Sequence, residues 1–225
     1  SADGKNVRIL AAAIQSSDLV NTLQPYKEAQ LDPEIITPTV FALHNLYQAV
    51  PSYRGIVDGS VIVDIGTHVS TIIFIENSLP RMVRTIHRGS QSIIDALSAE
   101  LGASPQECAL LLRDPAKLLQ RGDNAQQIAE KHIRNFLHDI QFTLNAFSLK
   151  LNFYHPINKI LFAGQPAHIA PLIELAGSVL QTPSELLDVE QLFASNAIID
   201  KAKQVDINWQ SAAYSLGALL QPLKE

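Results

Sequence analysis

Carboxylate and hydroxyl side chains gather at the end of a short apolar run, within residues 64–71 of the 225-residue chain. They are Asp64, Thr67, Ser70 and Thr71, with Gly66 among them. A buried strand that ends here delivers the Asp64 carboxylate at its C-terminal end, and Gly66 allows a tight turn whose backbone N–H groups face an anion. Asp64 can also hold a hydrated Mg²⁺ between itself and phosphate groups. The pattern predicts a phosphate or magnesium–phosphate site; the alternative is an ordinary turn in which Asp64 accepts hydrogen bonds from backbone amides.

A second turn that could admit a ligand follows another apolar run, at Ala163-Gly164-Gln165-Pro166. In a nucleotide-binding fold, a glycine between a strand and a helix lets an adenosine approach the backbone closely. Proline removes a backbone donor and fixes φ. Gln165 and Pro166 therefore favour the alternative, a plain connection between a strand and a helix.

The remaining chain offers no arrangement typical of a catalytic or metal centre. The seven histidines do not cluster, and the spacing of His132 and His138 places them on different faces of a helix. A hairpin can bring His68 and His87 near Asp64, but no Ser-His-Asp arrangement, P-loop or dinucleotide motif accompanies them. We therefore expect no catalytic residue.

Composition narrows the classes of function. Apolar residues make up 47% of the chain, enough for a sizeable core, and the net charge of −5 gives no basic excess to bind nucleic acid. Cys108 is the single cysteine and lies in an apolar run, which indicates a buried thiol and a reducing compartment. No stretch approaches the roughly 18 apolar residues of a membrane span.

Strands alternating with helices after an opening meander predict an α/β sheet covered on both faces. The first strand of the meander is apolar on both faces, so we expect it to be central. The predicted strands are 61–65, 70–75, 81–86 and 159–163, with a turn at 76–78. The predicted helices are 90–101, closed by Gly102, one after the capping box at Ser104, a long one through 129–151, and those at 169–180 and 211–223.

The first 50 residues predict a short segment with the order strand, helix, strand, helix. Residues 7–14 and 35–36 are the predicted strands, and helices are expected from Ser16 and from Phe41. Such a short piece buries little surface by itself. We expect it to pack against a part of the protein upstream of residue 1, and we expect self-association through an exposed apolar face. The residues proposed for that face are Phe41, Leu43, Leu46 and Tyr47.

The order of these motifs resembles the second half of the PilM-type pilus-assembly proteins. The motifs are Val61 to Gly66, Arg88-Gly89-Ser90, Leu101 to Ala109, Lys159 to Gly164 and Ala212 to Leu219. PilM-type proteins are relatives of FtsA in the actin and Hsp70 superfamily, and MshI and the cytoplasmic part of the type II secretion L protein are close alternatives. The resemblance covers nearly all of residues 7–223. It implies an actin-like (ribonuclease H-like) second-half domain over 56–225, with part of a small inserted α+β subdomain and its return helix over 1–55.

The resemblance also assigns candidate ligand-binding residues. Asp64, Gly66, Thr67 and Thr71 match the family's second phosphate motif, with Asp64 as the metal-binding residue. Gly89 matches one member of a glycine pair near the nucleotide, and Ser90 replaces the other. Gly164 is what remains of the glycine run that contacts adenosine. ATP and Mg²⁺ are the implied cofactors, and we find no copy of the first phosphate motif in this chain.

Proteins of this family resemble adaptors on the cytoplasmic face of the bacterial inner membrane. The resemblance implies a scaffold that binds the cytoplasmic tail of an inner-membrane pilus or secretion subunit and passes information to a secretion ATPase. The homodimer that we also expect rests on the exposed apolar face described above. Gln165, Pro166 and Ser90 stand where the family prefers glycine, so we expect a degenerate nucleotide site. Two alternatives are an actin-like ATPase completed by an N-terminal half and, more remotely, a sugar kinase of the same superfamily.

Overall fold

The computed structural model describes residues 12–53, 56, 59–151, 156–169, 171–192 and 209–220. Its centre is a five-stranded sheet in the order β3-β2-β1-β4-β5. The strands are β1 (Gly59–Ile65), β2 (Ser70–Glu76), β3 (Leu79–Ile86), β4 (Ile157–Ala163) and β5 (Ser184–Leu186). The first three form an antiparallel meander, and β4 and β5 run parallel to β1. Every residue of β1 is buried, which confirms its predicted central place.

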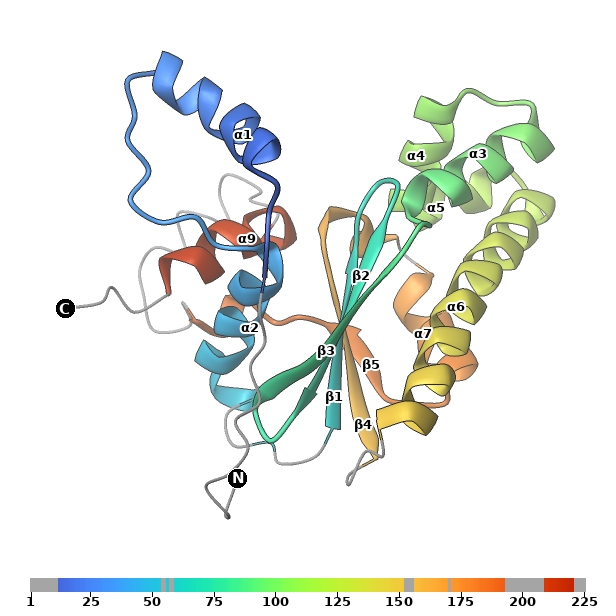
Figure 1. The fold of residues 1–225 in the computed structure, drawn as a ribbon. Coiled ribbons are helices and arrows are strands. Elements are labelled where there is room, and N and C mark those ends of the chain that lie inside the picture. Colours follow the sequence, from blue (N-terminus) through green and yellow to red (C-terminus); the bar gives the residue numbers. More distant parts are fainter. Residues whose placement is uncertain are drawn as a thin grey trace.

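Helices cover both faces of this sheet (Figure 1). On one side lie α3 (Ser90–Leu101), α4 (Pro105–Arg113), α5 (Pro115–Gln120), α6 (Asp123–Leu151) and α7 (Leu172–Leu180). On the other side lie α2 (Thr39–Ala49) and α9 (Trp209–Leu219). Successive residues of β1 point to opposite faces, so Val61 and Val63 enter the core with α3, α6 and α7, while Ile62 enters the core with α2. Two apolar cores thus sandwich one sheet, as the sequence predicts.

Local signals set several helix ends. Gly102 ends α3 in the left-handed conformation with φ 63°, where glycine meets no steric penalty. The Ser104 hydroxyl accepts a hydrogen bond from the N–H of Glu107 at 3.2 Å, which confirms the predicted cap of α4. The long helix is confirmed as α6, and its inward side chains, including Ile133, Phe136 and Ile140, are fully buried.

The N-terminal piece departs from the sequence prediction. Ile35 and Ile36 form no strand and are about half exposed, and residues 12–14 of the other predicted strand are likewise irregular, while 7–11 lie outside the described residues. The helix expected from Ser16 is confirmed as α1 (Ser16–Glu28), although no side chain caps it and none of its residues is buried. This helix stands apart from the sheet in Figure 1.

The prediction that α2 presents an exposed apolar face for self-association is wrong. Leu43, Leu46 and Tyr47 of α2 are at most 1% exposed because they pack against the sheet and α9.

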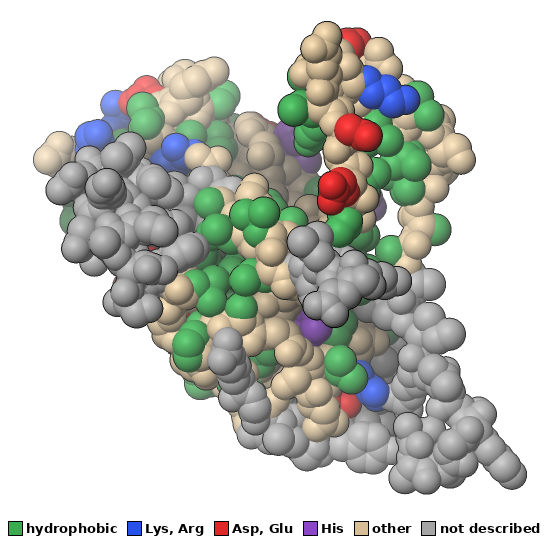
Figure 2. Space-filling view, turned by 90° about the vertical axis from the view of Figure 1, so that its left-hand side faces the viewer, with side chains coloured by type: hydrophobic (Ala, Val, Ile, Leu, Met, Phe, Trp, Pro, Cys, Tyr) green, Lys and Arg blue, Asp and Glu red, His purple; other side chains and the backbone are tan. Residues whose placement is uncertain are grey.

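The side of the molecule that carries α1, α2 and α9 shows two projecting lobes with a hollow between them (Figure 2). One lobe carries α1. No helix in the described residues is long and apolar enough to cross a membrane.

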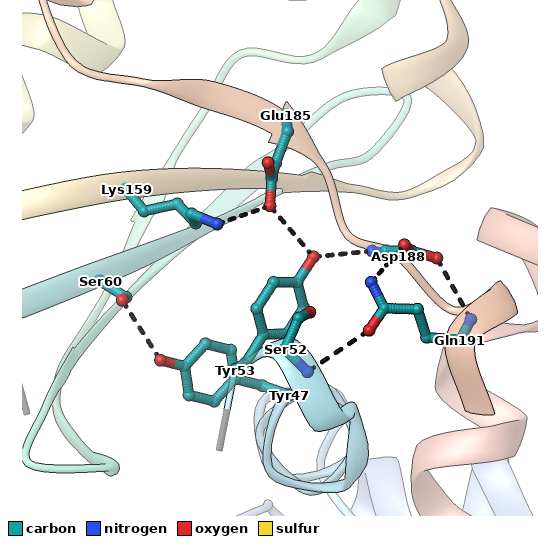
Figure 3. A network of polar contacts seen from close by, with 8 residues as sticks. All are labelled: Tyr47, Ser52, Tyr53, Ser60, Lys159, Glu185, Asp188 and Gln191. Atoms are coloured by element: carbon teal, nitrogen blue, oxygen red, sulfur yellow. Dashed lines mark hydrogen bonds and ion pairs between the residues drawn. The ribbon is translucent and has the colours of Figure 1, made fainter. Parts of the chain in front are cut away.

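A polar network ties the 3-10 turn after α2, Pro51–Tyr53, to β5 (Figure 3). The Tyr53 hydroxyl accepts a hydrogen bond from the N–H of Asp188 at 3.0 Å and donates one to Glu185 at 3.3 Å. Lys159 of β4 lies 3.0 Å from the same Glu185 carboxylate. Burial raises the pKa of Tyr53, so its hydroxyl stays protonated as a donor. The network ties Pro51–Tyr53 to β4, to β5 and to the residues that follow β5.

Candidate functional site

Sheet register brings the two predicted ligand turns together. Asp64 pairs with Thr71 of β2 on one side and with Ala163 of β4 on the other. Because β1 and β4 are parallel, their carboxyl ends meet at one edge of the sheet, where open α/β sheets bind ligands. Gly164, which follows β4, therefore lies next to Asp64.

Gly164 is required by the protein's own backbone. Its φ is +90°, and a Cβ on it would lie 2.3 Å from the carbonyl oxygen of Ile65 and 2.9 Å from Oδ1 of Asp64. A side chain cannot fit between these strands. Gln165–His168 then form a short 3-10 helix, as expected of a plain connection between a strand and a helix. The glycine is explained without an adenosine.

The turn after β1 is clamped to the start of α3. The N–H groups of Ser90 and Gln91 donate to the carbonyl oxygens of Gly66 and Thr67 at 3.0 and 2.9 Å. A Cβ on Gly89 would lie 2.4 Å from the Gly66 oxygen, so Gly89 permits this close approach. Gly66 itself closes the turn by donating to the Val69 carbonyl oxygen at 3.0 Å.

Two backbone N–H groups of this turn are available to a ligand. No described residue accepts a hydrogen bond from the N–H groups of Thr67 and His68, and both side chains are exposed. Thr71 is half-buried, while the Ser70 hydroxyl is used internally because it donates to the Arg88 carbonyl oxygen at 2.8 Å. Adjacent free N–H groups in a turn can bind an anion. The arrangement can therefore hold a phosphate group.

Asp64 has a partner that the sequence did not reveal. The hydroxyl of Tyr214, on α9, donates a hydrogen bond to Oδ1 of Asp64. The Asp64 side chain is nearly buried, and its burial raises the pKa of the carboxyl, an effect that the Tyr214 hydrogen bond partly offsets. Burial and the neighbouring Asp64 raise the pKa of Tyr214, which keeps the donor protonated. Tyr214 is separated from Asp64 by 150 positions, and nothing in its local pattern points to this contact.

Asp64 and the turn after it offer different groups to a cation and to an anion. Among the described residues no acceptor is found for the N–H groups of Thr67 and His68, which suit phosphate oxygens. The Asp64 carboxylate is 8% exposed and accepts the Tyr214 hydroxyl at Oδ1. A carboxylate has about four acceptor sites, so this one hydrogen bond leaves Asp64 able to face a hydrated Mg²⁺ through its other sites.

The other candidates from the sequence do not join the site. His68 and His87 are exposed, and His132 is held by Glu100 at 2.6 Å on another part of the surface. Cys108 is buried, as predicted, and burial raises the pKa of its thiol. Within the described ranges, no three His, Cys, Asp or Glu side chains could hold a metal ion together.

The β3-β2-β1-β4-β5 sheet has helices on both faces, and two turns meet beyond β1 and β4; this arrangement is the one expected of an actin-like domain. The chain is similar to a chain of the PilM-PilN type IV pilus biogenesis complex, with a TM-score of 0.74 and 16% identity over 91% of this chain and 58% of that one. It is also similar to the ethanolamine utilization protein EutJ from Carboxydothermus hydrogenoformans, with a TM-score of 0.61 and 14% identity over 80% of this chain and 60% of that one.

A third similar structure is MreB 5 of Spiroplasma citri bound to AMPPNP, with a TM-score of 0.53 and 12% identity over 87% of this chain and 67% of that one. No protein-family model and no curated protein matches the sequence. The chain spans 58% and 60% of the length of the PilM-complex chain and EutJ. These likenesses establish a PilM-like, actin-like fold, which confirms the predicted fold class.

Proposed function

We propose that this chain is the second-half domain of a scaffold in a type IV pilus or type II secretion assembly. The observation that carries the proposal is its likeness to a chain of the PilM-PilN complex over 91% of its residues. The state of Asp64 supports a scaffold over an efficient ATPase, because the carboxylate is buried and engaged by Tyr214. A scaffold needs binding surfaces and no catalytic base.

The proposed partner is the cytoplasmic tail of an inner-membrane pilus or secretion subunit, which would place the protein at the cytoplasmic face of that membrane. PilM is found in a complex with PilN, and we extend the same kind of partnership to this chain. A secretion ATPase and a second copy of the chain are further partners in this proposal. The predicted division into 1–55 and 56–225 is part of it too.

Binding of tail peptides tests the scaffold role. Peptides covering the cytoplasmic tails of the pilus and secretion subunits encoded by the source bacterium are titrated into the protein, with scrambled peptides of equal composition as controls. We expect one tail to bind saturably and its scrambled form not to bind. The proposal fails if no tail binds to the chain or to its full-length parent.

The second candidate is a nucleotide-binding actin-like ATPase. The N–H groups of Thr67 and His68 beside Asp64 favour it, because no described residue accepts a hydrogen bond from them, and MreB 5 of Spiroplasma citri, which has a similar fold, binds AMPPNP. ATP hydrolysis by the full-length parent, measured as phosphate release, would support this candidate. Tail binding without phosphate release would leave the scaffold as the function.

A further inference from the structure

The two oxygens of the Asp64 carboxylate have different surroundings. Oδ1 accepts a hydrogen bond from the Tyr214 hydroxyl and lies 2.9 Å from the point where a Cβ on Gly164 would stand. Within the part of the chain that the structure describes, no group donates to Oδ2, although Asp64 is only 8% exposed. A buried polar atom without a partner is rare and indicates a bound water, ion or ligand. Oδ2 is therefore the oxygen that a ligand would use.

The surroundings of Oδ2 suit a hydrated cation. Thr71 stands directly opposite Asp64 in the β1–β2 ladder, so the two side chains lie on the same face of the sheet. The half-buried Thr71 hydroxyl likewise has no hydrogen-bond partner among the described residues. Mg²⁺ keeps several of its waters and is usually held through one or two carboxylates and the phosphates of a nucleotide. Oδ2 and the Thr71 hydroxyl can both accept hydrogen bonds from such waters.

Tyr214 limits how the Asp64 carboxylate can turn. Its helix, α9, packs against α2 so closely that a Cβ on Gly217 would lie 1.9 Å from the carbonyl oxygen of Ala42. The Asn45 amide also donates to the Gly217 carbonyl oxygen at 3.3 Å. From this support the Tyr214 hydroxyl holds Oδ1, and a hydrogen bond to a charged acceptor is stronger than one between neutral groups. Carboxylates that bind metals are generally oriented by a hydrogen bond of this kind.

We propose that Tyr214 is a positioning residue: its hydroxyl fixes Oδ1 of Asp64, so that Oδ2 is presented to the divalent cation of a metal-bound nucleotide. The inference rests on the nucleotide site of the second candidate function above and does not depend on tail binding. It concerns binding of the nucleotide and not its hydrolysis, so it is compatible with a scaffold that lacks an efficient ATPase. Tyr214 acts on the cation only through Asp64.

ATP titrations of the full-length parent in EDTA and in excess Mg²⁺, followed by calorimetry, test the proposal. We expect Mg²⁺ to lower the Kd of the wild-type protein. In Tyr214→Phe we expect this gain to shrink about tenfold, the lower end of the usual cost of losing a group that orients a metal ligand, while the Kd in EDTA stays unchanged. Asp64→Asn should lose the Mg²⁺ response, and adding Tyr214→Phe to it should change nothing further.

Asn45→Ala is the matched control, because it removes another hydrogen bond to α9 and leaves the Tyr214 hydroxyl in place. It should lower the melting temperature and keep the wild-type response to Mg²⁺. A purely structural role for Tyr214 would weaken ATP binding by Tyr214→Phe equally in both buffers, and that outcome overturns the proposal.

The wild-type protein alone can also overturn the inference. ATP binding that does not respond to Mg²⁺ contradicts it and leaves a nucleotide site without a cation. Absence of ATP binding in both buffers contradicts it together with the second candidate function. The tail-peptide titration is unaffected by these outcomes, so failure of this inference is distinguishable from failure of the scaffold role.

Discussion

Gly217 of α9 faces the carbonyl oxygen of Ala42 in α2 with no space between them for a side chain: a Cβ on Gly217 would lie 1.9 Å from that oxygen. The two helices cover one face of the sheet, and α9 carries the tyrosine that engages Asp64. This helix contact lies about one helical turn from Tyr214 on α9, so it helps to hold the tyrosine against Asp64. The same contact gives the first of four tests.

Gly217→Ala should force α2 and α9 apart and destabilise the fold by about 1–3 kcal/mol, the usual cost of overfilling a packed contact. Gly177→Ala is the matched control, since it also lies within a helix but a Cβ there meets nothing within 4 Å. Alanine favours a helix over glycine, so the control should gain about 0.5–1 kcal/mol. Urea unfolding of both variants measures the difference, and equal stabilities would contradict the described α2–α9 contact.

Gly164→Ala should destabilise the chain strongly. The residue has a φ of +90°, and the new Cβ would lie 2.3 Å from the Ile65 carbonyl oxygen. Backbone strain of this kind costs about 1–3 kcal/mol before the overlap is counted. Gly102→Asn is the control, because Gly102 also has positive φ, at 63°, but open space around it, and asparagine tolerates that conformation. Thermal melting should separate the two variants clearly; a mild Gly164→Ala would mean that the two turns lie farther apart.

Asp64→Asn should stabilise the protein at neutral pH. Burial raises the pKa of the Asp64 carboxyl above its ordinary value of 3.8. A group with a raised pKa contributes stability that is fully present below the unfolded value and is lost as pH rises through the folded value. The neutral amide escapes this loss and can still accept the Tyr214 hydrogen bond. The gain in melting temperature should be present at neutral pH and shrink as pH falls toward 3.8.

Asp114→Asn should change the melting temperature in the opposite direction to Asp64→Asn. The N–H of Lys117 donates to the Asp114 carboxylate and lowers its pKa from 3.8, so this group stabilises the fold above that value and ceases to do so as pH falls through its folded pKa. The variant should lose melting temperature at neutral pH and approach the wild type in acid. Parallel pH profiles for Asp64→Asn and Asp114→Asn would refute the described environments of both carboxylates.

Tyr53→Phe tests the polar network between Pro51–Tyr53 and β5. The change leaves the N–H of Asp188 without its acceptor and removes one of the two donors to Glu185, the other being Lys159, which should cost about 1–3 kcal/mol at this buried position. Tyr26→Phe is the control, because Tyr26 lies exposed on α1. Urea midpoints should fall for Tyr53→Phe and stay unchanged for Tyr26→Phe. A neutral Tyr53→Phe would show that water replaces the hydroxyl.

Much of this fold was predictable because its signals are local. The apolar run 61–65 marks the central strand, Gly102 and Ser104 mark helix boundaries, and the three- and four-residue steps of 129–151 mark the long helix. Each of these depends on neighbours in the chain. The apolar pair Ile35 and Ile36 is too short to form a repeating pattern, and these residues are irregular in the structure.

The sequence by itself determined most of the strands and helices after residue 50 and the candidate status of Asp64, Gly66 and Gly164, since these follow from apolar periodicity and turn chemistry. The resemblance to PilM-type proteins was also visible in the sequence, as a resemblance in the order of its motifs. Only the tertiary structure decided that α2 is buried and that Tyr214 engages Asp64. Both depend on contacts between α2, α9 and β1, segments far apart in the chain. Pairing of distant side chains leaves no periodic trace in a single sequence, because it is fixed by how the helices pack on the sheet.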